Sequence, residues 1–299
     1  MGVTFNYDPC TFETARPRTP PSRTDGYQER RKGPRALTYA ETNVGQTISR
    51  LLSEHPDLDA SADGALDNLD QFHIGGADAV DLLIGGLALT EGDRVLDIGS
   101  GFGGPARQIA RRTGNRVIGV DITPAYVDAA RDLTVKARLN DLTHFRVGDI
   151  ATFEPDPRFE AAITMHVQMN VQDKTAWFAH IARCLAPGAR LAIWEVCQPR
   201  QADLPWPMPW SLDGTDSFVV TARSLRASIE QAGFAAAEWT NETAWVQAWI
   251  TRTFANGLPA GPALPMLLDD GYTRVLNATA ALGNGSLEIW RGVFTKNAG

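Results

Sequence analysis

The sequence has few cysteines and lacks any long apolar run. Its three cysteines, Cys10, Cys184 and Cys197, are too few and too widely spaced for a zinc site or a disulfide framework. No segment approaches the roughly 18 consecutive apolar residues that a membrane helix needs. The first ten residues also lack the charged-then-apolar pattern of a secretory signal. These absences predict a cytoplasmic protein with no membrane partner.

Basic charge is scarce as well. The 299 residues carry 28 Lys and Arg against 35 Asp and Glu, a net charge of −7. A nucleic-acid surface needs a basic face that neutralises phosphates, so we expect no nucleic-acid partner. Residues 1–36 lean basic and are rich in Pro, Arg and Thr without a hydrophobic period, which is typical of an irregular arm. The remaining chain, in a protein with 43% hydrophobic residues, suffices for a large core.

Short apolar runs alternate with helical patterns along most of the chain. Such alternation predicts an α/β fold with a doubly wound, mostly parallel sheet that helices cover on both faces. Right-handed crossovers then fix how the sheet is wound. The expected sheet has seven strands, at 94–100, 117–121, 144–149, 161–167, 191–196, 234–243 and 286–295.

Several residues predict where helices begin and end. Thr123 is expected as an N-cap, with Pro124 in the first helical position. A helix over 177–185 should be stopped by the turn at Pro187-Gly188. Gly233 is a good C-terminal glycine for the helix that precedes it.

The patterns divide the chain into three parts. Residues 1–76 are expected to form an N-terminal arm and helical cap, 77–197 the nucleotide-binding core, and 198–299 a lid followed by the last helix and strands. The lid contains LPWPMPW (204–210), where alternating prolines exclude regular structure. A long insertion over about 244–284 separates the last two strands.

The most informative segment is the turn VLDIGSGFGGPAR (95–107). Its glycines at 99, 101 and 103 leave a turn without side chains, so that a ligand can lie against the backbone. The following helix directs its free N–H groups into the same space, which favours a carboxylate or phosphate. Gly99-x-Gly101-x-x-Gly104 also fits the dinucleotide fingerprint, with Asp121 near the position of a ribose-binding acid. The glycines alone therefore leave a nicotinamide cofactor and S-adenosylmethionine both open.

Three features favour S-adenosylmethionine. Asp97 lies inside the first strand, where a carboxylate would repel a pyrophosphate but suits a ligand with an ammonium and a sulfonium. Asp149 closes the third strand, where an adenine amino group needs an acceptor. The third feature is the chain order of five strands, a helix and two late strands.

The combination of motifs resembles class I S-adenosylmethionine-dependent methyltransferases. The similarity is greatest to the small-molecule branch, which includes sarcosine/dimethylglycine, quinone and natural-product methyltransferases. The segments that carry the resemblance are QFHIGG (71–76), VLDIGSGFGGPAR (95–107), GVDIT (119–123), VGDIATF (147–153), MHVQMNVQDK (165–174) and LAPGARLAIWEV (185–196).

The resemblance implies S-adenosylmethionine as cofactor and assigns roles to three acids. Asp97 would hold the methionine end, Asp121 would accept hydrogen bonds from both ribose hydroxyls, and Asp149 would bind the adenine amino group. Ile122 and Ile150 would enclose the adenine ring from its two faces.

The same resemblance places the glycines and the segment before them around the cofactor. Gly99, Gly101 and Gly103 would pass beneath the methionine and ribose. His73 and Gly75 would close over the cofactor from the N-terminal side.

His166 is the leading candidate for a general base. It closes the fourth strand at the carboxyl edge of the sheet, where ligands bind in doubly wound folds, and imidazole has a suitable intrinsic basicity. A histidine here can equally hydrogen-bond the cofactor or a neighbouring loop. Gln168 and Asn170 lie on the same loop and are candidates for orienting substrate. Methyl transfer from a sulfonium is an in-line displacement that needs no metal.

Aromatic residues in the lid suggest the acceptor. Trp206, Trp210 and Phe218 suit an aromatic substrate by stacking and apolar burial, or a cationic amine by cation–π attraction. Ordinary core packing is the competing interpretation, as for Trp245 and Trp249, which lie four residues apart as on one helix face.

The leading hypothesis is a methyltransferase for a small aromatic or heteroaromatic natural-product-type metabolite, with a carbon, nitrogen or oxygen acceptor. One alternative is a methyltransferase for an aliphatic amine of the sarcosine type. A scaffold that binds S-adenosylmethionine without catalysis, and a nicotinamide oxidoreductase, are more distant alternatives. The N-terminal arm can close over the site of its own chain or over that of a partner in a homodimer.

Overall fold

The computed structural model describes residues 44–200, 203–255 and 263–298. All of them belong to one compact unit, residues 37–299. The irregular arm expected over residues 1–36 lies outside the described residues. Within the described ranges, no helix has the length and apolar character needed to cross a membrane.

Seven strands form one sheet in the order β3-β2-β1-β4-β5-β7-β6, and the predicted α/β doubly wound architecture is confirmed. Neighbouring strands from β3 through β5 are parallel, whereas β7 runs antiparallel between β5 and β6. The strands are β1 (Arg94–Ile98), β2 (Arg116–Asp121), β3 (Thr143–Val147), β4 (Phe159–Met165), β5 (Leu185–Cys197), β6 (Phe234–Asn241) and β7 (Glu288–Lys296).

Helices cover both faces of the sheet, because the strands are apolar on both sides. The core against α3, α4 and α5 includes Val95 and Val117, and the core against α6 and α7 includes Leu96 and Ile98. These helices are α3 (Gly76–Leu87), α4 (Gly104–Thr113), α5 (Pro124–Lys136), α6 (Lys174–Cys184) and α7 (Ala222–Gln231).

One predicted helix boundary needs correction. Helix α6 ends at Cys184 rather than at the Pro187-Gly188 turn, because Leu185 already pairs with Phe159 as the first residue of β5. The register then shifts before Ala161, so the Pro-Gly pair sits in an irregular stretch of a strand.

Thr123 occupies the N-cap position of α5, but its side chain does not cap the helix. Its backbone N–H instead donates to the Asp121 carboxylate at 2.8 Å. The prediction for Gly233 is confirmed: it follows the end of α7 with φ of +95°.

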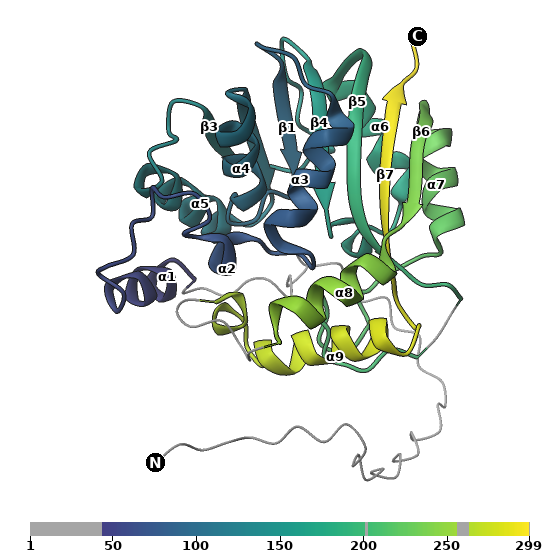
Figure 1. Ribbon diagram of the computed structural model, residues 1–299. Coiled ribbons are helices and arrows are strands. Elements are labelled where there is room, and N and C mark those ends of the chain that lie inside the picture. The colour runs from purple at the N-terminus through teal and green to yellow at the C-terminus, as the bar shows by residue number, and fades with distance from the viewer. Residues whose placement is uncertain (1–43, 201–202, 256–262, 299) are drawn as a thin grey trace, which may run out of the picture. The chain divides into compact units, whose positions relative to one another are not determined.

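The stretch between the last two strands lies at the carboxyl edge of the parallel strands. Because Cys197, the last residue of β5, pairs with Glu288, the first of β7, the helix before β7 must lie at that edge. Figure 1 shows α8 and α9 running across this end of the sheet. The elements are α8 (Thr243–Thr253), the 3-10 helix η2 (Leu264–Leu267) and α9 (Gly271–Gly283).

The N-terminal helices are α1 (Val44–Ser53), which packs against α5 through apolar residues, and α2 (Asp67–Asp70), which a buried ion pair joins to α4. Asp70 accepts from the Arg107 guanidinium at 2.7 Å, and each side chain is only 4% exposed. Arg107 also donates to the carbonyls of Phe102 and Ala130 and to the Thr134 hydroxyl. The buried charge is therefore well compensated.

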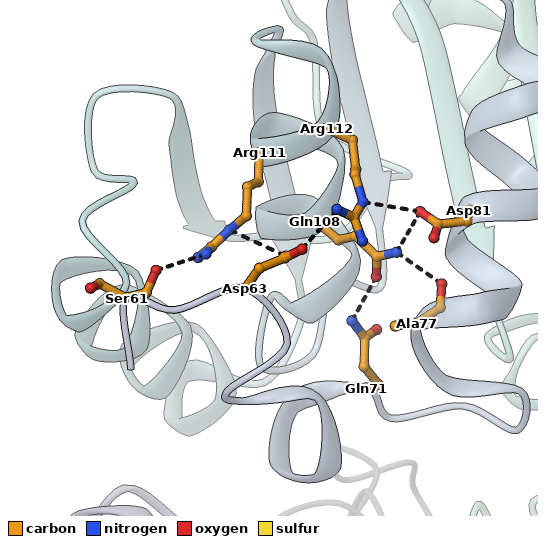
Figure 2. A network of polar contacts seen from close by, with 8 residues as sticks. All are labelled: Ser61, Asp63, Gln71, Ala77, Asp81, Gln108, Arg111 and Arg112. Carbon is orange, nitrogen blue, oxygen red and sulfur yellow. Dashed lines mark hydrogen bonds and ion pairs between the residues drawn. The ribbon is translucent and has the colours of Figure 1, made fainter. Parts of the chain in front are cut away.

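The outer face of α4 carries a second set of polar contacts to the same N-terminal segment. Figure 2 shows that the Gln108 side chain accepts a hydrogen bond from the Gln71 amide and donates to the Ala77 carbonyl and the Asp81 carboxylate. Arg111 and Arg112 reach Ser61 and Asp63 in the loop before α2, and Arg112 also pairs with Asp81 of α3. Helix α4 thus fixes the segment that leads into the site.

We expect Asp70→Ala to destabilise the protein by about 3 kcal/mol, because it leaves the Arg107 charge buried without its carboxylate. Asp63→Ala is the matched control: its carboxylate is 54% exposed and its ion pairs should contribute less than about 1 kcal/mol. Urea unfolding of both variants measures the difference. Equal losses of unfolding free energy in the two variants would show that the buried ion pair stabilises the protein no more than the exposed ones.

Candidate functional site

The glycine turn follows β1 at the carboxyl edge of the sheet. Gly99, Gly101 and Gly103 have φ of +72°, +51° and +80°, a region that favours glycine. A Cβ on Gly99 would lie 2.4 Å from a methyl of Val167, so the loop after β4 packs directly on this turn. Among the described residues, a Cβ on Gly101 would contact only Phe72, at 4.0 Å, so no other described side chain crowds this glycine.

Asp121 holds the turn in shape. Its Oδ2 accepts the Gly101 N–H at 2.9 Å and its Oδ1 accepts the Thr123 N–H at 2.8 Å. Burial raises the pKa of this carboxyl, and the two N–H groups oppose that rise. Each oxygen keeps a further lone pair, so the carboxylate can accept from a ligand as well.

Asp97 lies in β1 and is buried. Burial and the neighbouring Asp121 charge raise its pKa to about 7, while Arg107 opposes the rise. Its Oδ2 has no hydrogen-bond partner within the described part of the chain. Such an isolated buried oxygen is costly, and a cationic ligand would compensate it.

The residues predicted to contact adenine lie after β2 and β3. Asp149 is exposed, and its Oδ1 accepts the Ala151 N–H at 2.9 Å. Ile122 is 50% exposed, whereas Ile150 is buried in the core beside α6 and α7.

The structure brings His73 and His166 together from segments far apart in the sequence. Their ring centroids are 6.3 Å apart with the planes nearly perpendicular. Burial lowers the pKa of His73 to about 4, and burial together with His73 lowers the pKa of His166 to about 3, so both rings are neutral near neutral pH. The Nε2 of His166 and the Nδ1 of His73 lack partners among the described residues.

Each histidine is positioned by its own segment. His73 Nε2 lies 3.0 Å from the side-chain Oε1 of Gln71, and the Gln71 amide donates in turn to Gln108 Oε1. His166 adopts φ of +53°, which is unfavourable for a residue with a Cβ, and its N–H donates to the Trp194 carbonyl at 2.9 Å.

Glu195 was missed by the sequence analysis and holds the loop that follows His166. It is completely buried in β5, and it accepts the N–H groups of Val167 and Gln168 at 3.2–3.4 Å. Burial raises its pKa to about 8, against the opposing effects of these N–H groups and the Lys174 charge. An acid inside the apolar run LAIWEV, next to this loop, was the signal that could have identified it.

The residues proposed for substrate lie on this loop and in the lid. Gln168 is completely buried, and its amide donates to the Val196 carbonyl at 2.5 Å. Asn170 is half-buried at the end of the 3-10 helix η1 (Gln168–Asn170). The Phe218 N–H donates to the Met169 carbonyl, and this bond joins the lid to η1.

Within the lid, aromatic residues pack onto neighbouring lid residues. Trp210 is 2% exposed and donates to the Ser217 hydroxyl at 2.9 Å. Trp206 is half-buried against Gly214, where a Cβ would lie 2.5 Å from the indole. LPWPMPW forms no regular element, as predicted; one isolated bridge joins Met208 to Ser211.

Two further tryptophans position the segment that carries His73. Trp194 donates to the Ile74 carbonyl at 2.8 Å and meets Trp245 edge-on at 5.6 Å. Gly75 lies between the two rings with φ of +102°, and a Cβ there would lie 2.8 Å from Ala79. Trp194 and Trp245 therefore have a packing role.

Several buried polar atoms at the carboxyl edge of the sheet have no hydrogen-bond partner among the described residues. Besides the two histidine nitrogens and the Asp97 oxygen, the hydroxyl of Ser100 in the glycine turn is buried and lacks a partner in the described ranges. Folded proteins rarely leave such atoms unsatisfied, so their concentration around one turn indicates a ligand site.

Part of the chain is similar to known methyltransferases. Residues 95–188 match the family model described as a methyltransferase domain. A demethylmenaquinone methyltransferase from Tropheryma whipplei (strain Twist) is 35% identical over 120 residues, 40% of this chain and 48% of that protein. A 27-O-demethylrifamycin SV methyltransferase from Amycolatopsis mediterranei (strain S699) is 35% identical over 114 residues, 38% of this chain and 42% of that protein. The chain thus spans less than half the length of these relatives.

A solved structure shows the same fold. Geranyl diphosphate C-methyltransferase from Streptomyces coelicolor A3(2), in complex with Mg²⁺, geranyl diphosphate and S-adenosyl-L-homocysteine, aligns with a TM-score of 0.58 and 19% identity. The alignment covers 74% of this chain and 78% of that one. The class I methyltransferase fold that the sequence motifs predicted is confirmed.

We expect Asp97→Asn to stabilise the protein at pH 8 by about 1–3 kcal/mol. Folding raises the pKa of Asp97 from 3.8 to about 7. The contribution of this carboxyl to the free energy of unfolding is therefore most favourable below pH 3.8, and it is lost as the pH rises through 7. The amide of the variant does not titrate, so the variant does not lose stability in this way.

Urea unfolding at pH 6 and pH 8 measures the effect, with the exposed Asp132→Asn as control. The advantage of Asp97→Asn over wild type should grow between the two pH values. A constant difference, or a loss of stability at pH 8, would contradict the assignment.

Proposed function

We propose that this chain is an S-adenosylmethionine-dependent methyltransferase that acts on a small molecule. One observation carries the proposal: buried carboxylates and unpartnered polar atoms surround the glycine turn at the carboxyl edge of the sheet. S-adenosylmethionine supplies a methyl group already activated on a sulfonium. The matched domain and relatives support the same activity.

The charges of the site favour this cofactor over a dinucleotide. The Asp97 carboxyl is buried and has an unpaired oxygen, which suits the ammonium end of a methionine moiety and would repel a pyrophosphate. Asp121 keeps lone pairs for ribose hydroxyls while it accepts the N–H groups of Gly101 and Thr123. No described side chain other than Phe72 crowds Gly101, so the ligand can lie against the backbone there.

We propose His166 as the residue that faces the acceptor. Its neutral ring presents an unpartnered Nε2, which can accept a hydrogen bond from an acceptor hydroxyl or amine. Because burial lowers its pKa to about 3, the ring is a weak base, and it takes the proton only as methyl transfer makes that proton acidic.

For the acceptor we propose a small aromatic or heteroaromatic metabolite of the natural-product type. The lid contributes Trp206 and Phe218, both half-buried, next to the η1 loop that follows His166. Flat apolar rings suit such side chains. Two relatives are named for a demethylmenaquinone and a 27-O-demethylrifamycin SV, and the second of these is a natural product.

Asp121→Ala should lower the affinity for S-adenosylhomocysteine by about 100-fold or more, because it removes the ribose acceptor and loosens the turn at Gly101. Isothermal titration calorimetry measures the affinity. Asp128→Ala, a change of the same type on the exposed face of α5, should bind as wild type does. If Asp121→Ala binds with wild-type affinity, or wild type binds no S-adenosylhomocysteine, the cofactor assignment is wrong.

His166→Ala should reduce kcat by about 10²–10⁴-fold and change the affinity for S-adenosylhomocysteine by less than about threefold. Turnover is followed as S-adenosylhomocysteine release with a panel of catechols, phenols, indoles and sarcosine. Because the His166 pKa is about 3, wild-type kcat should show no ionisation of this residue near pH 6.5.

Near-normal turnover of His166→Ala would remove it as the base. Turnover of sarcosine alone would favour the aliphatic-amine alternative. S-adenosylhomocysteine binding without turnover of any acceptor would favour the non-catalytic scaffold.

A further inference from the structure

Arg274 is a buried cation in the insertion between β6 and β7. It lies on α9, at the carboxyl edge of the sheet, and its side chain is 1% exposed. Arginine is almost never fully buried unless it is paired, because removing the guanidinium from water is costly.

The contacts of Arg274 are too few for a buried guanidinium. Of its five N–H donors, one reaches the Pro209 carbonyl at 3.5 Å, and its Nε has no partner in the part of the chain that the structure describes. Within the same ranges, no carboxylate lies within ion-pair distance of it.

Arg107 provides an internal comparison. Its side chain is equally buried, yet it has the Asp70 carboxylate at 2.7 Å together with two carbonyls and a hydroxyl. Both arginines have an Nε without a partner among the described residues, but Arg107 has an ion pair and three further hydrogen bonds, whereas Arg274 has one long hydrogen bond there.

The described part of the lid supplies Arg274 with one hydrogen-bond acceptor, the Pro209 carbonyl. Pro205, Pro207 and Pro209 leave this stretch with carbonyl acceptors, and two of these carbonyls are taken by α9: Pro207 by the Asn277 amide at 2.9 Å and Pro209 by Arg274. The lid side chains Met208 and Trp210 are buried and apolar or aromatic. Among the described residues no anion complements this charge, and a bound carboxylate would do so.

We propose that Arg274 binds a carboxylate of the methyl acceptor, so that the substrate is a small carboxylic acid. This inference rests on the proposed methyltransferase function. One guanidinium neutralises one carboxylate and matches its two oxygens in a bidentate pair. A diphosphate, as in the geranyl diphosphate complex, carries more charge than one arginine compensates.

The lid links the two ends of such a substrate. It is attached to α9 through Pro207 and Pro209, and to the η1 loop that follows His166 through the Phe218–Met169 hydrogen bond. A carboxylate held from α9 would place the rest of the molecule beneath the lid, with the methyl-accepting atom toward the His166 side.

The test compares benzoate with benzamide, its uncharged isostere, as ligands of the full-length protein loaded with S-adenosylhomocysteine. Thermal unfolding and equilibrium titration are followed at matched ionic strength for wild type, Arg274→Met and Arg274→Lys. Arg252→Met is the control: it removes an exposed arginine of α8, in the same insertion.

Wild type and Arg252→Met should bind benzoate at least about tenfold more tightly than benzamide, and Arg274→Met should lose that preference. Arg274→Lys should retain part of it, because the charge remains but the planar fork is lost. The affinity for S-adenosylhomocysteine should stay within about threefold in all variants.

The inference is overturned if wild type does not prefer benzoate, including the case in which neither probe binds. It is also overturned if Arg274→Met responds to benzoate as wild type does. Should Arg274→Met fail to fold, the wild-type preference and its reduction in Arg274→Lys decide the question. Failure of wild type to bind S-adenosylhomocysteine would instead refute the proposed function.

Discussion

The Asp121 carboxylate is the constraint on which the site depends. By accepting the N–H groups of Gly101 and Thr123, it ties the turn after β1 to the turn after β2. A second carboxyl, that of Asp97, lies nearby, and burial together with the Asp121 charge raises its pKa to about 7. The arrangement is unfavourable for the empty protein, because two acids share one buried edge, and it becomes favourable when a cation lies beside them.

The same conflict recurs around the site. Burial shifts the pKa values of Asp97, Glu195, His73 and His166 toward their neutral forms, and several of their polar atoms have no partner among the described residues. A core made only for stability would place apolar groups there. The buried Glu195 carboxyl fixes the loop after β4, because it accepts the backbone N–H groups of that loop. In addition, the hydrogen bond from the His166 N–H to the Trp194 carbonyl holds that histidine at a positive φ.

Much of this was predictable because the signals are local. Apolar runs that end in glycine or aspartate predicted the strands, and the carboxyl ends of parallel strands must meet at one edge. The resemblance of the motifs added His73, and the structure places it beside His166. The pairing of Asp70 with Arg107 and the near-isolation of Arg274 were not predictable, since both depend on side chains brought together from distant segments. The end of α6 was predicted wrongly because a proline-glycine pair usually marks a turn, whereas here the pairing of Leu185 with Phe159 outweighs that preference.

The two sides of the site are attached to the core by different physical means, and they meet at one segment. The segment before α3 is bound to α4 by charged and amide contacts, which reach Gln71 through Gln108 (Figure 2), and the Gln71 Oε1 lies 3.0 Å from His73 Nε2. The insertion is bound by aromatic packing: Trp245 of α8 lies against Gly75, and Trp249 lies against Gly76. A displacement of α8 must therefore move the backbone next to His73, because neither glycine has a side chain to absorb it. Helix α8 and the segment that carries His73 thus form one packed unit beside the proposed site.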